Sequence, residues 1–165
     1  MGDVTLSYVE RLTLANQYRI LEILDPDSSA DYKQSREIVE SGYEFLYETL
    51  NPSIHTEPMP KHAGDELYSI LDMFRALEFS AKDIGKTTQE MSVEFEGFDG
   101  NHDGHHYRLS IFVRRTQGKW SELSHYPDNS HSQASLPRYR KMLKAWKGMG
   151  KPHKLTEKQI EELRG

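Results

Sequence analysis

The residues whose types could do chemistry gather between positions 99 and 106, in the order Asp-Gly-Asn-His-Asp-Gly-His-His. The first six positions match the start of an EF-hand calcium loop, in which alternate side-chain oxygens point inward and glycine makes the sharp turn. The twelfth position of such a loop is a bidentate glutamate, but here it is Ser110. We therefore prefer a turn in which Asp99 and Asn101 hydrogen-bond the backbone, because both residue types tolerate left-handed geometry.

The same stretch offers a transition-metal alternative. Imidazole nitrogens and a carboxylate can bind such an ion, so the candidate metal ligands are His102, His106 and Asp103. On a helix, His102 and His106 would share one face, whereas the neighbours His105 and His106 would point apart. The sequence supplies no obvious fourth ligand, and a solvated histidine loop is the competing interpretation. We therefore expect no metal or other cofactor.

Two polar residues, Asn16 and Gln17, fall in the middle of a predicted helix. Asparagine is a poor helix former, so its place there needs a reason. The two side chains either line a pocket that recognises a ligand or are buried amides that bond a neighbouring loop. We prefer the second interpretation, because most buried amides are satisfied within the protein.

Arg75 and Trp120 complete the candidate ligand or partner residues, beside Asn16, Gln17, Asp99 and Asn101. Arg75 stands three residues after Asp72 and is expected either to form an ion pair with it or to anchor the turn at 98–99. Trp120 is interpreted as a core anchor in preference to a ligand platform.

The carboxy-terminal third carries a basic run in a chain whose formal net charge is -5. The candidate nucleic-acid contacts are Arg138, Arg140, Lys141 and Lys144, interleaved with Tyr139 and Trp146. Such a run fits nucleic acid or an acidic protein. It equally fits the solvated face of an amphipathic helix, which we prefer.

Composition bounds the remaining possibilities. The 165 residues suffice for one domain with its own core, and we expect a single helical domain over residues 1–165. The chain contains no cysteine, which excludes disulfides, thiolate metal sites and a cysteine nucleophile. It shows no phosphate-binding glycine loop, dinucleotide fingerprint or nucleophile elbow, so we lean against an enzyme. Without a signal peptide or an apolar stretch long enough to span a membrane, the expected compartment is the cytoplasm and no membrane partner is expected.

Helical signals dominate the first half of the chain. Ser7 and Glu10 form a capping-box pattern before a helix predicted over 7–24, with apolar spacing that begins at Val9 and Leu12. A second helix is predicted from Ser28 or Ser29 to Gly42, where glycine suits a left-handed cap. A helical turn over 43–50 and a proline-rich loop over 51–62 follow, and apolar spacing over 67–77 predicts the next helix.

The second half is less regular. An amphipathic piece over 80–87 precedes a turn at 95–101. Residues 107–115 are ambiguous, because Tyr107, Leu109, Ile111 and Val113 alternate as in a strand while other spacings suit a helix. A polar loop over 124–135 leads to a predicted helix over 137–147 with proline in its first turn, and Thr156 with Gln159 caps a last helix.

Five ordered strings along the chain resemble segments of the YfbU family. They begin at Leu14, Leu71, Phe95, Gly118 and Tyr139, and read LANQYRIL, LDMFR, FEGFDGN, GKWSEL and YRKML. The resemblance implies a mainly α-helical, irregular multi-helix bundle with little or no β-structure, and a bacterial or bacteriophage source. It favours helix over strand for residues 107–115. It implies no established activity.

Three functions from different classes follow. The first is a non-enzymatic interaction or regulatory protein that forms a homo-oligomer or binds a protein partner, motivated by aromatic residues expected at the surface, namely Tyr8, Tyr43, Tyr47 and Trp146. The second is a nucleic-acid-associated regulator that uses the basic run. The third is a metal-dependent enzyme at the 99–106 loop. We rank them in that order.

Overall fold

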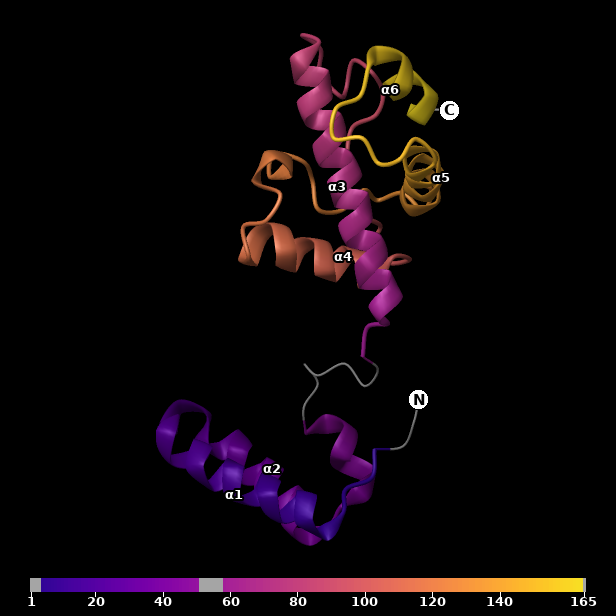
Figure 1. Ribbon diagram of the computed structural model, residues 1–165. Coiled ribbons are helices and arrows are strands. Elements are labelled where there is room, and N and C mark those ends of the chain that lie inside the picture. The colour runs from indigo at the N-terminus through magenta and orange to yellow at the C-terminus, as the bar shows by residue number, and fades with distance from the viewer. Residues whose placement is uncertain (1–3, 51–57, 165) are drawn as a thin grey trace. The chain divides into compact units, whose positions relative to one another are not determined.

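The computed structural model describes residues 4–50 and 58–164, and the chain divides into two compact units, Met1–Pro58 and Met59–Gly165 (Figure 1). The two are called here the first unit and the second unit, and each is described by itself. Both are built from helices, and the described residues form no strand; Phe98 and Asn129 make one isolated parallel bridge. The predicted mainly α-helical class is confirmed.

The first unit is a helical hairpin followed by a short turn of helix. Its elements are α1 (Tyr8–Leu24), η1 (Pro26–Ser28), α2 (Ser29–Ser41) and η2 (Glu44–Thr49). The capping box is present as predicted: the Ser7 hydroxyl accepts from the Glu10 amide, and the Glu10 carboxylate accepts from the Ser7 amide. Gly42 ends α2 with a φ of 70°, the predicted left-handed cap. Local signals therefore define the start of α1 and the end of α2, whereas Ser28 at the N-cap of α2 makes no capping hydrogen bond through its side chain.

Few apolar side chains are buried inside this hairpin. The buried ones are Ala15, Ile38 and Val39, and Tyr47 is buried on η2. Ion pairs join the two helices instead, with Arg36 Nε at 2.6 Å from Glu22 and Arg19 at 2.7 Å from Glu40. Figure 1 shows α1 and α2 side by side along their length. Much apolar surface of α1 is consequently left uncovered.

The second unit is arranged around one long helix, α3 (Lys61–Asp83). The elements after it are α4 (Gly104–Ile111), the π-helical η3 (Phe112–Thr116), η4 (Ser121–Leu123), α5 (Ser135–Gly148) and α6 (Glu157–Arg164), which pack around α3 in Figure 1. The helix predicted over 67–77 extends in both directions. It includes the first part of the amphipathic piece expected at 80–87, because Ser80 and Ala81 are buried and continue its inner face.

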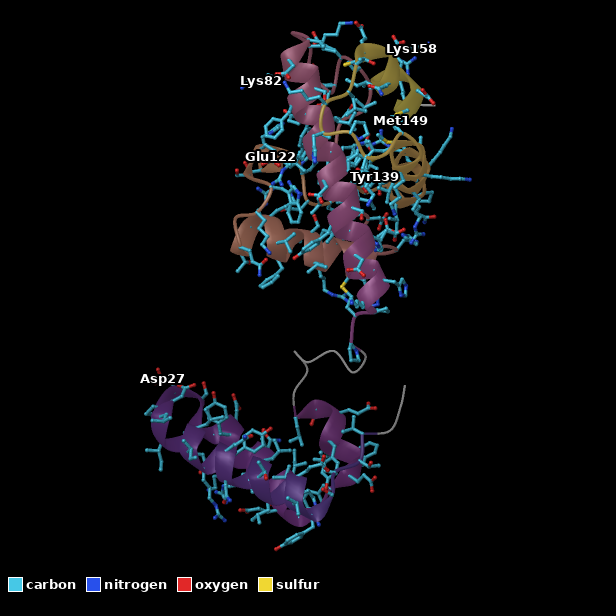
Figure 2. The ribbon with its side chains drawn as sticks, viewed as in Figure 1. Asp27, Lys82, Glu122, Tyr139, Met149 and Lys158 are labelled. Carbon is cyan, nitrogen blue, oxygen red and sulfur yellow. The ribbon has the colours of Figure 1, made fainter. Side chains whose placement is uncertain are left out.

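Aromatic rings fill the centre of the second unit. Tyr139, labelled in Figure 2, projects from α5 toward α3, where its ring centroid lies 4.8 Å from that of Phe74. Phe95 and Phe98, from the segment before α4, also pack on the Tyr139 ring. The Tyr139 hydroxyl donates to the Gly97 carbonyl at 3.0 Å and accepts from the Glu96 amide at 2.8 Å. The predicted turn over 95–101 is thus fastened to the core.

Residues 107–115 are helical, as the family resemblance implies and against their alternating pattern. The buried positions are His106, Ser110, Val113 and Arg114, which recur with the helical period. Because three of these four are polar, an apolar stripe is not visible in the sequence. The predicted carboxy-terminal helices are also confirmed, the last with its Thr156–Gln159 capping box.

Candidate functional site

The Asp99 side chain forms the predicted turn. Its Oδ1 accepts hydrogen bonds from the backbone amides of Asn101 at 2.7 Å and His102 at 3.2 Å. These bonds, chiefly the one from Asn101, hold the pKa of the Asp99 carboxyl below its usual range. Asp99 itself is buried and Asn101 is exposed. The turn interpretation is confirmed for Asp99, whose carboxylate is engaged by the backbone, whereas Asn101 takes part through its backbone amide.

The candidate histidines have different partners. His106 Nε2 lies 2.9 Å from Glu66 Oε2, and Glu66 also accepts two hydrogen bonds of 2.9 Å from Arg140. Burial lowers the pKa of His106, partly offset by the Glu66 carboxylate. His102 Nδ1 lies 3.3 Å from Asp99, and its Nε2 lies 2.9 Å from the amide nitrogen of Gln133.

Asp103, the third predicted ligand, accepts from the Asp99 amide at 3.4 Å through its side chain. Across residues 4–50 and 58–164, no three histidine, aspartate or glutamate side chains are arranged so as to hold a metal ion. The loop therefore provides hydrogen bonds within the fold.

Arg75 and Trp120 meet at the surface of α3. The Trp120 indole donates to Asp72 Oδ1 at 2.9 Å, and its ring packs edge-on against Tyr68 at 5.0 Å. Arg75 pairs with Glu122, lies 3.9 Å from Asp72 and stacks over the Trp120 ring. Trp120 is buried, as predicted for a core anchor. Arg75 fastens η4 to α3, so its expected alternative role at the 98–99 turn is not the one observed.

Sequence reasoning missed Arg114, a buried cation. Its guanidinium donates to the carbonyls of Leu123 at 2.6 Å and Tyr126 at 2.9 Å, and lies 3.1 Å from Asp128. Desolvation lowers the pKa of Arg114, against the attraction of Asp128. The contacts tie the 123–128 loop to η3. The one hint in the sequence is the arginine pair at 114–115 directly after an apolar run.

The basic run divides into paired and unpaired cations. Arg138 lies 3.2 Å from Glu96, and Arg140 holds Glu66, so both arginines are engaged within the fold. Lys141 and Lys144 are exposed, and in the described part of the chain neither forms an ion pair. Trp146 is buried against the core and not exposed as expected, so no tryptophan from α5 is available for base stacking.

Asn16 and Gln17 are both exposed, so the interpretation as buried amides is wrong. Asn16 lies on a face of α1 whose other members are apolar. We call this the α1 face and define it as Val9, Leu12, Asn16, Ile20 and Ile23, whose apolar members expose 67%, 50%, 55% and 78% of their surface in that order. Tyr8 and Leu24 are exposed at its ends.

The apolar residues Val9 and Leu12, whose spacing predicted the helix, thus point away from the hairpin core. The aromatic surface expectation is right for Tyr8 and Tyr43, which are exposed, and wrong for Tyr47, which is buried. A shallow depression of about 180 Å³ runs between α1 and α2, bordered by Leu12, Asn16 and the Arg19–Glu40 ion pair. It adjoins the α1 face, so both features belong to one surface.

No helix in the described part of the chain is long and apolar enough to cross a membrane. Together the elements define an all-α protein with a helical hairpin in its first unit and a helix-centred core in its second.

Comparison with known proteins assigns this chain to a family. Residues 4–164 match the family model described as the YfbU domain, and the chain belongs to the YfbU family. It is 31% identical to the UPF0304 protein MJECS11 of Methanocaldococcus jannaschii, over 96% of this chain and 98% of that protein. It is 25% identical to a UPF0304 protein of Actinobacillus succinogenes, over 96% of this chain and 97% of that protein. The family is uncharacterised.

Proposed function

We propose that this protein acts by binding and not by catalysis, and that it self-associates through the α1 face. The observation that carries the proposal is the exposure of four branched apolar side chains on one side of a single helix, Val9, Leu12, Ile20 and Ile23. Contiguous apolar surface of this kind is typical of protein interaction sites. The cytoplasm stays the predicted compartment.

The charges around the α1 face support an apolar partner. No member of the face is charged. The nearest cation, Arg19, is paired with Glu40, and Glu10 is held in the capping box. A partner would therefore bury apolar surface without leaving a charge unpaired, which is the condition for a stable interface core.

The energy available is sufficient for association. Fully burying a Val, Leu or Ile side chain contributes about 1.5–3 kcal/mol. Because roughly half to three quarters of each side chain is still exposed, burying the four residues of two copies would contribute on the order of 10 kcal/mol of free energy. The lost translational and rotational entropy of association costs about 4–15 kcal/mol. The balance is consistent with a reversible dimer.

The test is multi-angle light scattering of the full chain over a dilution series. Ile20→Asp places a charge one helical turn from the centre of the α1 face and is expected to convert the dimer to a monomer. Gln34→Asp, which adds the same charge at an exposed position of α2, is the matched control and should leave the mass unchanged. A wild-type protein that is monomeric at all accessible concentrations would exclude the proposal.

A second candidate function is association with the phosphate backbone of a nucleic acid. It is favoured by one observation: no acidic residue occurs between positions 129 and 156, a segment that carries seven lysines and arginines. Lys141, Lys144, Lys147 and Lys151 are exposed there. Lysines on an exposed helix can contact phosphates without reading sequence.

The salt dependence of binding to a DNA duplex tests this candidate. Lys141→Gln with Lys144→Gln should weaken binding and reduce the slope of log K against log salt by about 2, since each phosphate contact contributes about 0.9. Lys33→Gln with Lys82→Gln removes the same charge from exposed positions elsewhere and should leave both the affinity and the salt slope unchanged. An unchanged slope in the α5 variant would exclude the lysines as contacts.

A further inference from the structure

The residues of the α1 face are spaced symmetrically about the middle of the helix. α1 runs from Tyr8 to Leu24, so Asn16 is its central residue. Leu12 and Ile20 each lie four residues from Asn16, and Val9 and Ile23 each lie seven residues from it. The spacing along the face is therefore three, four, four and three residues, which keeps all five positions on one side of an α-helix.

This symmetry is what a particular kind of interface requires. In a dimer with two-fold symmetry the same patch is used by both copies, so residue i contacts j and j contacts i. When two identical helices pack antiparallel, each residue meets the one at the same distance on the other side of the centre. An antiparallel pair therefore needs a face that is apolar at matching distances from its middle, whereas a parallel pair places no such demand.

We infer that α1 packs antiparallel against α1 of a second copy of this chain, about a two-fold axis at Asn16. This inference rests on the proposed self-association and specifies its geometry. Val9 packs against the partner's Ile23, and Leu12 packs against the partner's Ile20. Every apolar side chain of the α1 face then meets another apolar side chain, and four layers of packing flank the centre.

Asn16 supplies the polar centre of this arrangement. A carboxamide carries both a donor and an acceptor, so two Asn16 side chains that face one another across the axis can hydrogen-bond reciprocally. A shift by one helical turn would place each amide against a leucine or isoleucine without a partner, which is unfavourable in a desolvated seam. In parallel coiled coils a single asparagine in the apolar seam sets the register, and we assign the same role to the reciprocal amide pair here. It also explains a helix-disfavoured residue at the middle of α1.

The occupant is a second copy, because the α1 face offers matching apolar positions on both sides of Asn16, as two identical antiparallel helices require. The first unit carries more acidic than basic residues, yet the α1 face is uncharged and the flanking Arg19 is neutralised by Glu40. Two copies can therefore approach along this face without opposing like charges.

Cysteine cross-linking tests the geometry directly, because the natural chain contains no cysteine. Two single variants, Val9→Cys and Ile23→Cys, are prepared with different affinity tags and mixed under mild oxidation. The expected result is a disulfide between the two variants, because antiparallel packing brings position 9 of one copy next to position 23 of the other. Each variant alone should remain unlinked, since like positions would be about 21 Å apart along the helix axis. Asn16→Cys alone should cross-link, and Gln34→Cys on α2 should not.

The other outcomes discriminate between the proposals. A disulfide in Ile23→Cys alone, without one in the mixture, means parallel packing and overturns the inference while self-association stands. A dimer by light scattering that cross-links at none of the α1 positions overturns the α1 face as the interface. A monomer in light scattering overturns the proposed self-association and the inference together.

Discussion

Truncating Leu12 and Ile20, the apolar residues nearest the centre of the α1 face, should make the dimer dissociate while leaving the hairpin folded. The change is Leu12→Ala with Ile20→Ala, which removes three carbon atoms at each site. Each buried methylene contributes about 0.8 kcal/mol, so a fully buried side chain would lose about 2.4 kcal/mol. The two side chains expose 50% and 55% of their surface in the protomer, and the interface can remove only that part from water.

Each substitution therefore weakens the dimer by about 1.2 kcal/mol, and four substituted side chains per dimer weaken it by about 5 kcal/mol. The dissociation constant should rise by about three to four orders of magnitude. Sedimentation velocity over a dilution series measures this change, and far-ultraviolet circular dichroism monitors the helix content, which should be unchanged.

Phe45→Ala is the matched control for lost apolar surface. Phe45 exposes 93% of its surface on η2 and lies outside α1, so its truncation removes a larger exposed side chain without touching the α1 face. Its dimer should dissociate as the wild type does. The reasoning fails if Phe45→Ala weakens the dimer as much as the double variant does, or if the double variant raises the dissociation constant less than tenfold.

Three further predictions concern the second unit and are read out by urea unfolding of the full chain. Gly97→Ala should destabilise it by about 2–3 kcal/mol, because a Cβ would lie 2.4 Å from the Asp128 carbonyl oxygen and the φ of 83° disfavours a side chain. Gly118→Ala is the control: its φ of 64° is similar but a Cβ there meets open space, so its loss of stability measures the backbone strain without the clash. Arg114→Met should lose about 3 kcal/mol, since the carbonyls of Leu123, Tyr126 and Pro127 lose its buried hydrogen bonds and Asp128 loses one of its two cations. A neutral result would mean that the bonds from Arg115 are enough to hold the loop. The pKa of His106 is lowered in the folded protein, so as the pH falls the unfolded chain takes up a proton there more readily than the folded protein does. The free energy of unfolding should therefore fall between pH 7.5 and 5.5, and it should fall less in His106→Gln. An equal pH dependence in both proteins would refute this assignment.

Much of the helical framework could be predicted from the sequence, because helix ends depend on neighbouring residues. The capping boxes at Ser7 and Thr156 and the glycine cap at Gly42 involve partners within a few positions, and all three are present. The Asp99 turn is equally local, since its carboxylate bonds amides two and three residues ahead. For these elements the hydrogen-bond partners lie within a few residues of one another, so the sequence alone is enough to predict them.

Other features could not be predicted, because their partners are distant in the chain. Glu66, which engages His106, is 40 residues away, and the indole of Trp120 bonds Asp72 across 48 residues. A histidine beside other histidines therefore suggested metal ligation, although in the fold it meets a carboxylate that also accepts from an arginine. The composition of residues 107–115 favoured a strand, although the segment is helical, because polar Ser110 and Arg114 occupy buried positions and interrupt the apolar stripe of a helix.

The sequence by itself determined the helical class, the ends of most helices and the membership of the YfbU family, because each depends on local patterns or on strings in order. Only the tertiary structure decided which side of α1 is covered. Apolar spacing marks a face that avoids water, but it does not say what covers that face. In the described hairpin the contacts with α2 use Ala15 and the ion pairs of Arg19 and Glu22, so the apolar α1 face remains open.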